Sequence, residues 1–244
     1  MIYITGDIHG EDSITKFSSH HFPIGKTLTR DDYVIICGDF GLVWANTAEE
    51  RYWRKWLEEK PWTTLWIDGN HENFVRLREF PEEDWHGGKV QRITEHVLHL
   101  CRGHVFDIGG KSFFAFGGAE SHDKSYRVPG KTIWEEELPS PAELARGLAS
   151  LDRAGWQVDY VLSHSLPQSL QSSFFGAEHY RGNCLTAFFE EIAAKLQFRT
   201  WFSGHYHLSQ MIAENFCLLY HDIIELSDTG FTLVSDQVDD ILWK

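Results

Sequence analysis

The clearest pattern along the chain is a series of short apolar runs, each followed at once by a turn with glycine or polar residues. The first three runs cover residues 1–6, 33–37 and 64–67. Continuous apolar runs of this length are typical of strands covered on both faces of a sheet. A charged segment at 48–60, closed by Pro61, favours a helix between the second and third runs. This alternation predicts parallel βαβ units in one sheet.

The rest of the chain continues the pattern with a change of character. Residues 89–116 alternate between apolar and polar positions, which predicts three or four short strands leading into a second sheet. Residues 117–140 are rich in Gly, Pro and charge, so we expect a long loop over the functional site. The remaining segments are predicted as a helix at 141–154, a strand at 158–163, a loop at 165–182, a helix at 184–196, a strand at 199–203, and short strands and turns over 209–243.

Composition narrows the class of protein. The chain has 244 residues without an internal repeat or linker, so we predict one α/β domain over residues 1–244. A formal net charge of −14 disfavours nucleic acid or an anionic membrane as a partner. No apolar stretch approaches the roughly 20 residues that span a bilayer. The four cysteines lack a Cys-x-x-Cys spacing, which favours buried free thiols. No signal peptide is visible, and we expect a soluble cytoplasmic protein.

Five short motifs follow the apolar runs in a fixed order, and each contains residues that bind metal ions. They are Gly-Asp-Ile-His-Gly at 6–10, Gly-Asp at 38–39, Gly-Asn-His-Glu at 69–72, Ser-His at 163–164 and Gly-His-Tyr-His at 204–207. Each motif lies where a predicted strand ends, and strand ends are where a sheet brings side chains from separate elements together. Together the motifs predict a metal site.

The individual residues suit metal binding in different ways. Asp7 and His9 lie two positions apart and share one face of an extended segment. Asp39, alone after its strand, has two carboxylate oxygens and suits a bridge between two ions. Asn70 offers an amide oxygen and His164 an imidazole, although alone they could be a turn cap and a core histidine. Nitrogen and oxygen ligands without thiolate favour Mn, Fe or Zn over Mg or Ca.

The order and content of the five motifs resemble the calcineurin-like metallophosphoesterase superfamily, from Asp7 to His207. The resemblance implies a four-layer α-β-β-α sandwich with two facing mixed sheets and two divalent metal ions at one sheet edge, with Mn preferred and Fe or Zn as alternatives. The ligands it implies are Asp7, His9, Asp39 and His207 for one ion, and Asp39, Asn70, His164 and His205 for the other. It further implies that a metal-bridging hydroxide attacks phosphorus in line. His71 would then be catalytic, stabilising the phosphoryl oxygens or protonating the leaving oxygen.

The chain departs from the serine/threonine protein phosphatase branch of this superfamily. In that branch an Asp orients the catalytic His and two Arg clamp the phosphate, whereas these positions here are Leu42, Val43 and Asp68. Neither Val nor Asp replaces a bidentate Arg, which disfavours a phosphoprotein phosphatase. We expect hydrolysis of a small phosphomonoester or phosphodiester. The alternatives are a metal-dependent nuclease and a non-catalytic metal-binding scaffold.

Four further features have weaker signals. His122 and Arg127 lie in the expected loop and are candidates for substrate contact, with surface or core roles as the alternative. Trp44 could stack on an aromatic leaving group, although core packing is favoured. Glu72 is interpreted as a cap or support of the helix that follows it. The acidic run at 135–137 is interpreted as a solvated face.

Overall fold

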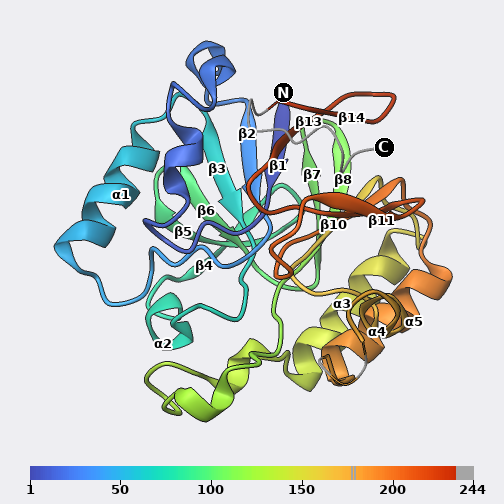
Figure 1. The fold of residues 1–244 in the computed structure, drawn as a ribbon. Coiled ribbons are helices and arrows are strands. Elements are labelled where there is room, and N and C mark those ends of the chain that lie inside the picture. Colours follow the sequence, from blue (N-terminus) through green and yellow to red (C-terminus); the bar gives the residue numbers. More distant parts are fainter. Residues whose placement is uncertain (177, 179, 235–244) are drawn as a thin grey trace.

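The computed structural model describes residues 1–176, 178 and 180–234, and its strands form two sheets that face each other (Figure 1). The strands of the larger sheet are β1 (Ile2–Thr5), β2 (Tyr33–Ile36), β3 (Thr63–Trp66), β4 (Glu82–Trp85), β5 (Gly88–Thr94), β6 (Val97–Leu100), β13 (Ile223–Leu226) and β14 (Phe231–Leu233). The strands of the smaller sheet are β7 (His104–Ile108), β8 (Lys111–Phe116), β9 (Tyr160–Ser163), β10 (Thr200–Ser203), β11 (Gln210–Ala213) and β12 (Phe216–Leu218).

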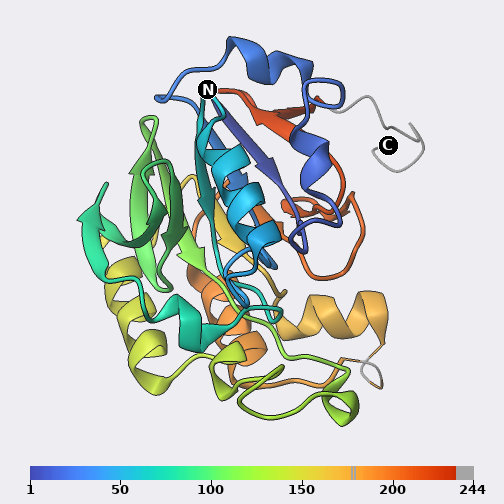
Figure 2. The ribbon, with the colours of Figure 1, turned by 90° about the vertical axis from the view of Figure 1, so that its left-hand side faces the viewer.

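Both sheets are mixed. The larger runs β14-β13-β1-β2-β3-β6-β5-β4 and the smaller runs β11-β12-β10-β9-β8-β7. In the larger sheet β1, β2 and β3 are parallel, as the apolar runs predict, and β6 is also parallel to β3. In the smaller sheet β8, β9, β10 and β12 are parallel. The carboxyl ends of the parallel strands therefore point toward one end of the molecule, at the bottom of Figure 1 and Figure 2.

Helices cover the outer face of each sheet. The helices are α1 (Ala48–Glu58), α2 (Phe74–Leu77), α3 (Pro141–Arg153), α4 (Gln168–Phe175) and α5 (Cys184–Lys195), with 3-10 turns η1 (Ile14–Phe17), η2 (Pro23–Thr27), η3 (Lys124–Tyr126) and η4 (Glu135–Glu137). In Figure 1, α1 lies beside the larger sheet, and α3, α4 and α5 lie beside the smaller one. Both α1 and α3 begin at a capping box, which satisfies backbone N–H groups of the first turn.

Three separate hydrophobic clusters fill the spaces between these layers. The central cluster lies between the sheets and includes Ile4, Leu65 and Leu162. A second cluster joins the outer face of the larger sheet to α1 and the 3-10 turns, for example through Trp66 and Leu57. A third joins the smaller sheet to its helices. Three apolar interfaces require four layers, so the predicted fold class is confirmed.

The structure corrects several details of the sequence prediction. The segment predicted as a loop at 165–182 contains α4, in which three Ser and two Phe have lower helix propensity than straight-chain residues. The loop at 117–140 contains η3 and η4, and the short strand β4 was not predicted. The predicted tail strands are present as β11 to β14, and residues 235–243 lie outside the described residues. One domain over 1–244 stays a prediction.

A buried ion pair joins the end of β3 to the crossing between the two sheets. Asp68 follows β3, and its Oδ2 accepts a hydrogen bond of 2.8 Å from Arg102 Nε as well as a second one from Nη2. His99 Nε2 lies 3.2 Å from the other carboxylate oxygen. Asp68 and Arg102 are 1% and 4% exposed. Burial opposes ionisation, but Arg102 and His99 hold the pKa of Asp68 well below its usual range.

We predict that Arg102→Met lowers the free energy of unfolding by about 3–5 kcal/mol, because it leaves the Asp68 carboxylate buried without its partner. Denaturant titration measures this change. Arg199→Met is the matched control, since Arg199 forms an exposed pair with Asp159 and should cost about 1 kcal/mol or less. Equal losses in the two variants would contradict a special role for the buried pair.

Candidate metal centre

The residues of the five motifs meet where the parallel strands end. Asp7 and His9 follow β1, Asp39 follows β2, Asn70 and His71 follow β3, His164 follows β9, and His205 and His207 follow β10. The adjoining turns are tight, because four non-glycine residues have a left-handed backbone. Their φ angles are 47° at His9, 46° at Asp39, 71° at His205 and 51° at His207. Strain of this kind is concentrated at functional sites in proteins.

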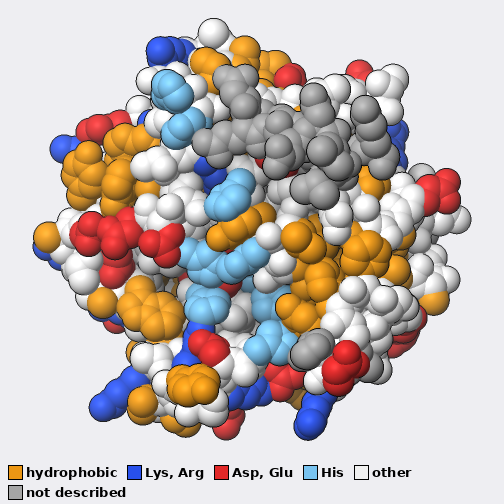
Figure 3. Space-filling model, viewed as in Figure 1, with side chains coloured by type: hydrophobic (Ala, Val, Ile, Leu, Met, Phe, Trp, Pro, Cys, Tyr) orange, Lys and Arg blue, Asp and Glu red, His pale blue; other side chains and the backbone are white. Residues whose placement is uncertain are grey.

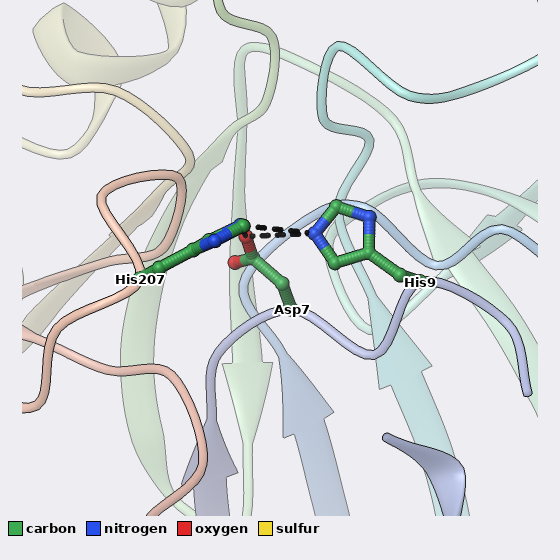
Figure 4. Close-up of side chains that lie close together, drawn as sticks. All are labelled: Asp7, His9 and His207. Atoms are coloured by element: carbon green, nitrogen blue, oxygen red, sulfur yellow. Dashed lines mark hydrogen bonds and ion pairs between the residues drawn. The ribbon is translucent and has the colours of Figure 1, made fainter. Parts of the chain in front are cut away.

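The first group of converging side chains is Asp7, His9 and His207 (Figure 4). Asp7 Oδ2 lies 3.6 Å from His9 Nε2 and 3.4 Å from His207 Nε2. The two Nε2 atoms are 3.1 Å apart. The Asp7 side chain is fully buried, whereas the His207 side chain is 51% exposed, so the group opens to solvent on one side. Figure 3 shows histidine side chains gathered near the middle of this face.

The second group is Asp7, Asp39 and His164, and all three are buried. His164 Nδ1 donates a hydrogen bond of 2.7 Å to the carbonyl oxygen of Cys37. Its Nε2 faces Asp39 Oδ2 at 3.3 Å and Asn70 Oδ1 at 3.2 Å, and this is the nitrogen that would bind a metal ion after losing its proton. This arrangement, in which the second ring nitrogen is held by a carbonyl, is typical of metal-binding histidines.

Hydrogen bonds to neighbouring groups fix the orientation of the Asn70 amide and the Asp39 carboxylate. Asn70 Nδ2 donates to Ser121 Oγ at 3.0 Å, which leaves Oδ1 facing the second group. Asp39 Oδ1 accepts from the backbone N–H of His71 at 2.8 Å, and its Oδ2 also lies 3.7 Å from His9 Nε2. Asp7 is the residue that the two groups share, and Asp39 of the second group also lies near His9 of the first. The bridging role of Asp39 stays a prediction.

His205 belongs to neither group. Its ring lies 5.1 Å from that of His164 and 5.7 Å from that of His122, measured between centroids. Its backbone N–H donates to Asp7 Oδ1 at 3.1 Å. Burial and the nearby His164 lower the pKa of His205 to about 3, so its imidazole is neutral. It is placed at the edge of the second group, and its role as a ligand stays a prediction.

Electrostatics favour a cation between these side chains. Burial opposes ionisation of Asp7 and Asp39, yet the histidines around them, His164 foremost, hold both pKa values well below the usual range. Burial likewise opposes the charge on His164, but Asp39 and Asp7 raise its pKa to about 10. A divalent cation would replace this proton as the positive charge that compensates the two carboxylates. Two buried carboxylates with nitrogen and amide-oxygen neighbours therefore fit metal ions of the expected kind.

His71 lies beside the two groups, next to Arg127. The His71 ring is 5.3 Å from that of His9 between centroids. Arg127 Nη2 lies 2.5 Å from His71 Nδ1 and 2.9 Å from His71 Nε2. The loop at 117–140 therefore reaches the site, through Arg127 and through Ser121. Leu42 and Val43 occupy the positions of the orienting Asp and of one clamping Arg in the protein phosphatase branch. Both are buried in the cluster outside the larger sheet.

Two acidic residues have roles other than the predicted ones. Glu72 does not cap the following helix α2, whose N-cap is Asn73. Its buried carboxylate instead accepts the backbone N–H of Phe40 at 2.7 Å and so supports the turn after β2. In the run predicted as a solvated face, Glu137 is 3% exposed, and its Oε2 accepts the N–H of Ser121 at 3.1 Å. Charge density alone cannot distinguish such inward-facing carboxylates.

Lys16 also supports the site, and nothing in the local sequence pattern predicts this role. This lysine of η1 donates to the carbonyl oxygens of Gly6 at 3.1 Å, Asp7 at 2.9 Å and Tyr220 at 2.7 Å. It therefore holds the chain at the first motif against the turn before β13. Burial lowers its pKa to about 7.

Trp44 is half-buried and packs edge-on against Trp134, with the ring centroids 5.2 Å apart. This contact agrees with the favoured packing role of Trp44.

Comparison with known proteins identifies the class that this fold and site define. A family model for calcineurin-like phosphoesterases matches residues 1–209. The chain belongs to this family, whose members are metal-dependent hydrolases of phosphate esters. A search of curated proteins finds no match.

Among solved structures, the chain is similar to the sulfate thiohydrolase SoxB of Thermus thermophilus, solved in complex with glycerol. The identity is 13% and the TM-score 0.41, over 84% of this chain and 39% of that one. The chain thus spans about two fifths of the length of that protein. Within the part of the chain that the structure describes, no helix is both long and apolar enough to cross a membrane.

We predict that Asp39→Asn strongly reduces bound metal, because the change removes a charge from a ligand of the second group that also lies near His9 of the first. Elemental analysis of purified protein loaded with Mn²⁺ measures the stoichiometry. Asp31→Asn removes the same charge from an exposed position before β2 and is the control. Unchanged stoichiometry in Asp39→Asn would refute the bridging role.

Proposed function

We propose that this protein is a dinuclear metal-dependent phosphoesterase that hydrolyses a small phosphomonoester or phosphodiester. The observation that carries the proposal is the convergence of two ligand groups that share Asp7, with Asp39 of the second group also 3.7 Å from His9 of the first. A single structural ion would need only one such group. Two adjacent ions are the arrangement that stabilises both the attacking and the leaving oxygen of a phosphate ester.

The proposed ligands are the residues that the motifs supply. They are Asp7, His9, Asp39 and His207 for one ion, and Asp39, Asn70, His164 and His205 for the other. When bound, two divalent ions, with Mn preferred and Fe or Zn as alternatives, would supply Lewis acidity and activate water near neutral pH. The chain itself contributes orientation, because the carboxylates and Asn70 are each fixed by a hydrogen bond to a neighbouring group.

His71 is proposed as the catalytic residue of the chain. Hydrolysis forms a bond from water oxygen to phosphorus as the bond to the leaving oxygen breaks, and the leaving oxygen takes up a proton. His71 is held beside the two groups by its backbone hydrogen bond to Asp39, so its ring can reach the phosphoryl or leaving oxygen. No carboxylate occupies the position of Leu42 to orient this ring, and Arg127 contacts it instead.

A cavity next to the site supports a small organic substrate. Its volume is ≈ 220 Å³, and His9, Trp44 and Trp53 are among the residues that line it. Glu11, Glu49 and Glu50 also line the cavity, so its walls suit the uncharged leaving group of a substrate better than a second anionic group. The net charge of −14 gives no support to a polymeric nucleic acid as substrate. We also propose a cytoplasmic location, supported by Cys37, Cys101 and Cys217 as buried free thiols.

We predict that metal-stripped protein has no phosphoesterase activity and that Mn²⁺ restores it. Hydrolysis of p-nitrophenyl phosphate and of bis-p-nitrophenyl phosphate, assayed side by side, measures the activity and separates monoesterase from diesterase. Reloading with Mg²⁺ is the comparison, since imidazole ligands favour the softer ion. Full Mn²⁺ occupancy without turnover of either compound would favour the scaffold alternative.

We predict that His71→Ala lowers turnover by about 10²–10⁴-fold, the usual contribution of general acid catalysis, while both metal ions stay bound. Steady-state kinetics and elemental analysis of the same preparation measure the two quantities. The control is His20→Ala, at an exposed histidine between η1 and η2. Loss of metal in His71→Ala would instead place His71 among the ligands.

A further inference from the structure

We propose that Arg127 binds the phosphoryl group of the substrate and gives the site a preference for phosphomonoesters over phosphodiesters. The proposal rests on the proposed function and adds a substrate-binding residue to it. In the protein phosphatase branch the clamping arginines occupy the positions of Val43 and Asp68. Arg127 comes from a different segment, the loop at 117–140.

Arg127 lies against His71, close to the first ligand group. Its Nη2 lies 2.5 and 2.9 Å from the ring nitrogens of His71, and that ring is in edge contact with His9. His71 thus lies between the guanidinium and His9 of the first ligand group. A phosphoryl oxygen that approaches His71 also approaches Arg127, so both groups can bind the same phosphate.

The guanidinium of Arg127 is held in place before any substrate binds. Arg127 Nε donates to Asp123 Oδ2 at 2.7 Å, and Nη1 donates to the carbonyl oxygen of Thr132 at 3.0 Å. Glu137 Oε1 lies 4.0 Å from Nη1. The side chain is 9% exposed, so it is not a mobile surface arginine. A fixed donor loses little conformational entropy when it binds a ligand.

The guanidinium of Arg127 has more N–H groups than its neighbours accept. A guanidinium has five N–H groups in one plane. Asp123 and Thr132 each accept one N–H. Nη2 lies near both ring nitrogens of His71, of which a neutral imidazole offers only one as an acceptor. One N–H therefore remains on Nη2 and one on Nη1, which is 4.0 Å from Glu137 Oε1. Two terminal N–H groups in a fork are the donors that bind two oxygens of one phosphate.

Two other buried cations near the site lack this capacity. Lys16 gives its three N–H groups to the backbone carbonyls of Gly6, Asp7 and Tyr220. Arg102 is engaged by Asp68 and by the carbonyl oxygen of Glu136. Of these three cations, Arg127 is therefore the one that both contacts the site and has spare donors.

The charge of the substrate decides how much Arg127 contributes. A phosphomonoester is close to dianionic at pH 8, whereas a phosphodiester carries a single charge. Coulomb attraction scales with the product of the charges, so the guanidinium stabilises the monoester more. A diester also has only two free oxygens, and the metal ions compete for them.

The test compares Arg127→Ala, Arg127→Lys and wild type, each loaded with Mn²⁺, on p-nitrophenyl phosphate and bis-p-nitrophenyl phosphate. We expect kcat/KM for the monoester to fall about 10–100-fold in Arg127→Ala, the range of one or two charged hydrogen bonds. For the diester we expect a fall of less than about 5-fold. Arg127→Lys should recover only part of the loss, because it lacks the fork. Lys131→Ala, an exposed cation of the same loop, is the matched control and should match wild type.

A binding measurement separates this proposal from the proposed function. Calorimetric titration of inorganic phosphate into the Mn²⁺-loaded proteins should show at least about 10-fold weaker binding in Arg127→Ala, with metal content unchanged. Millimolar guanidinium chloride should restore part of the monoester activity of this variant.

Equal losses on both esters, lost metal, or unchanged phosphate affinity would each overturn the role of Arg127. Wild-type protein without hydrolysis of any ester would overturn the proposed function alone, and the phosphate titration would still decide whether Arg127 binds phosphate.

Discussion

The organisation of this protein depends on two carboxylates that are buried at the end of a sheet. Asp7 and Asp39 are 0% and 1% exposed and remain ionised. Two negative charges in an interior of low polarity repel each other and require compensation by cations. The histidines provide part of it, and divalent ions would provide the rest. The strand ends, the tight turns and the backbone N–H groups around the site all serve to hold this concentration of charge.

The scaffold meets that requirement through rigidity. The site is built where parallel strands of two facing sheets end, and three apolar clusters fix those strands. The turns that present His9, Asp39, His205 and His207 adopt left-handed conformations, which cost roughly 1 kcal/mol each without glycine. Such strain persists only when the surrounding structure enforces it. Lys16 contributes to that enforcement by joining the first motif to the turn before β13.

The sequence predicts what depends on local pattern and leaves out what depends on distant contacts. Apolar runs ending in polar motifs located β1, β2, β3, β9 and β10, because continuous burial leaves a strong signal. The contact of Arg127 with His71 joins residues 56 positions apart and has no local signature. The same holds for Glu137, which looks like its solvated neighbours, and for α4, whose composition is that of a loop. Side-chain direction in a long loop is set by tertiary packing.

The Asp68–Arg102 pair also bears on how this chain could evolve. A phosphate-clamping arginine at position 68 would place a second guanidinium beside the buried Arg102, with no carboxylate between them. Such a change would need a simultaneous replacement of Arg102, and it would disturb the crossing between the two sheets. Acquiring the protein-phosphatase clamp therefore requires at least two coupled substitutions in the interior. Arg127, by contrast, contacts Asp123, Thr132 and His71. Substrate recognition at position 127 can therefore change without a replacement of Arg102.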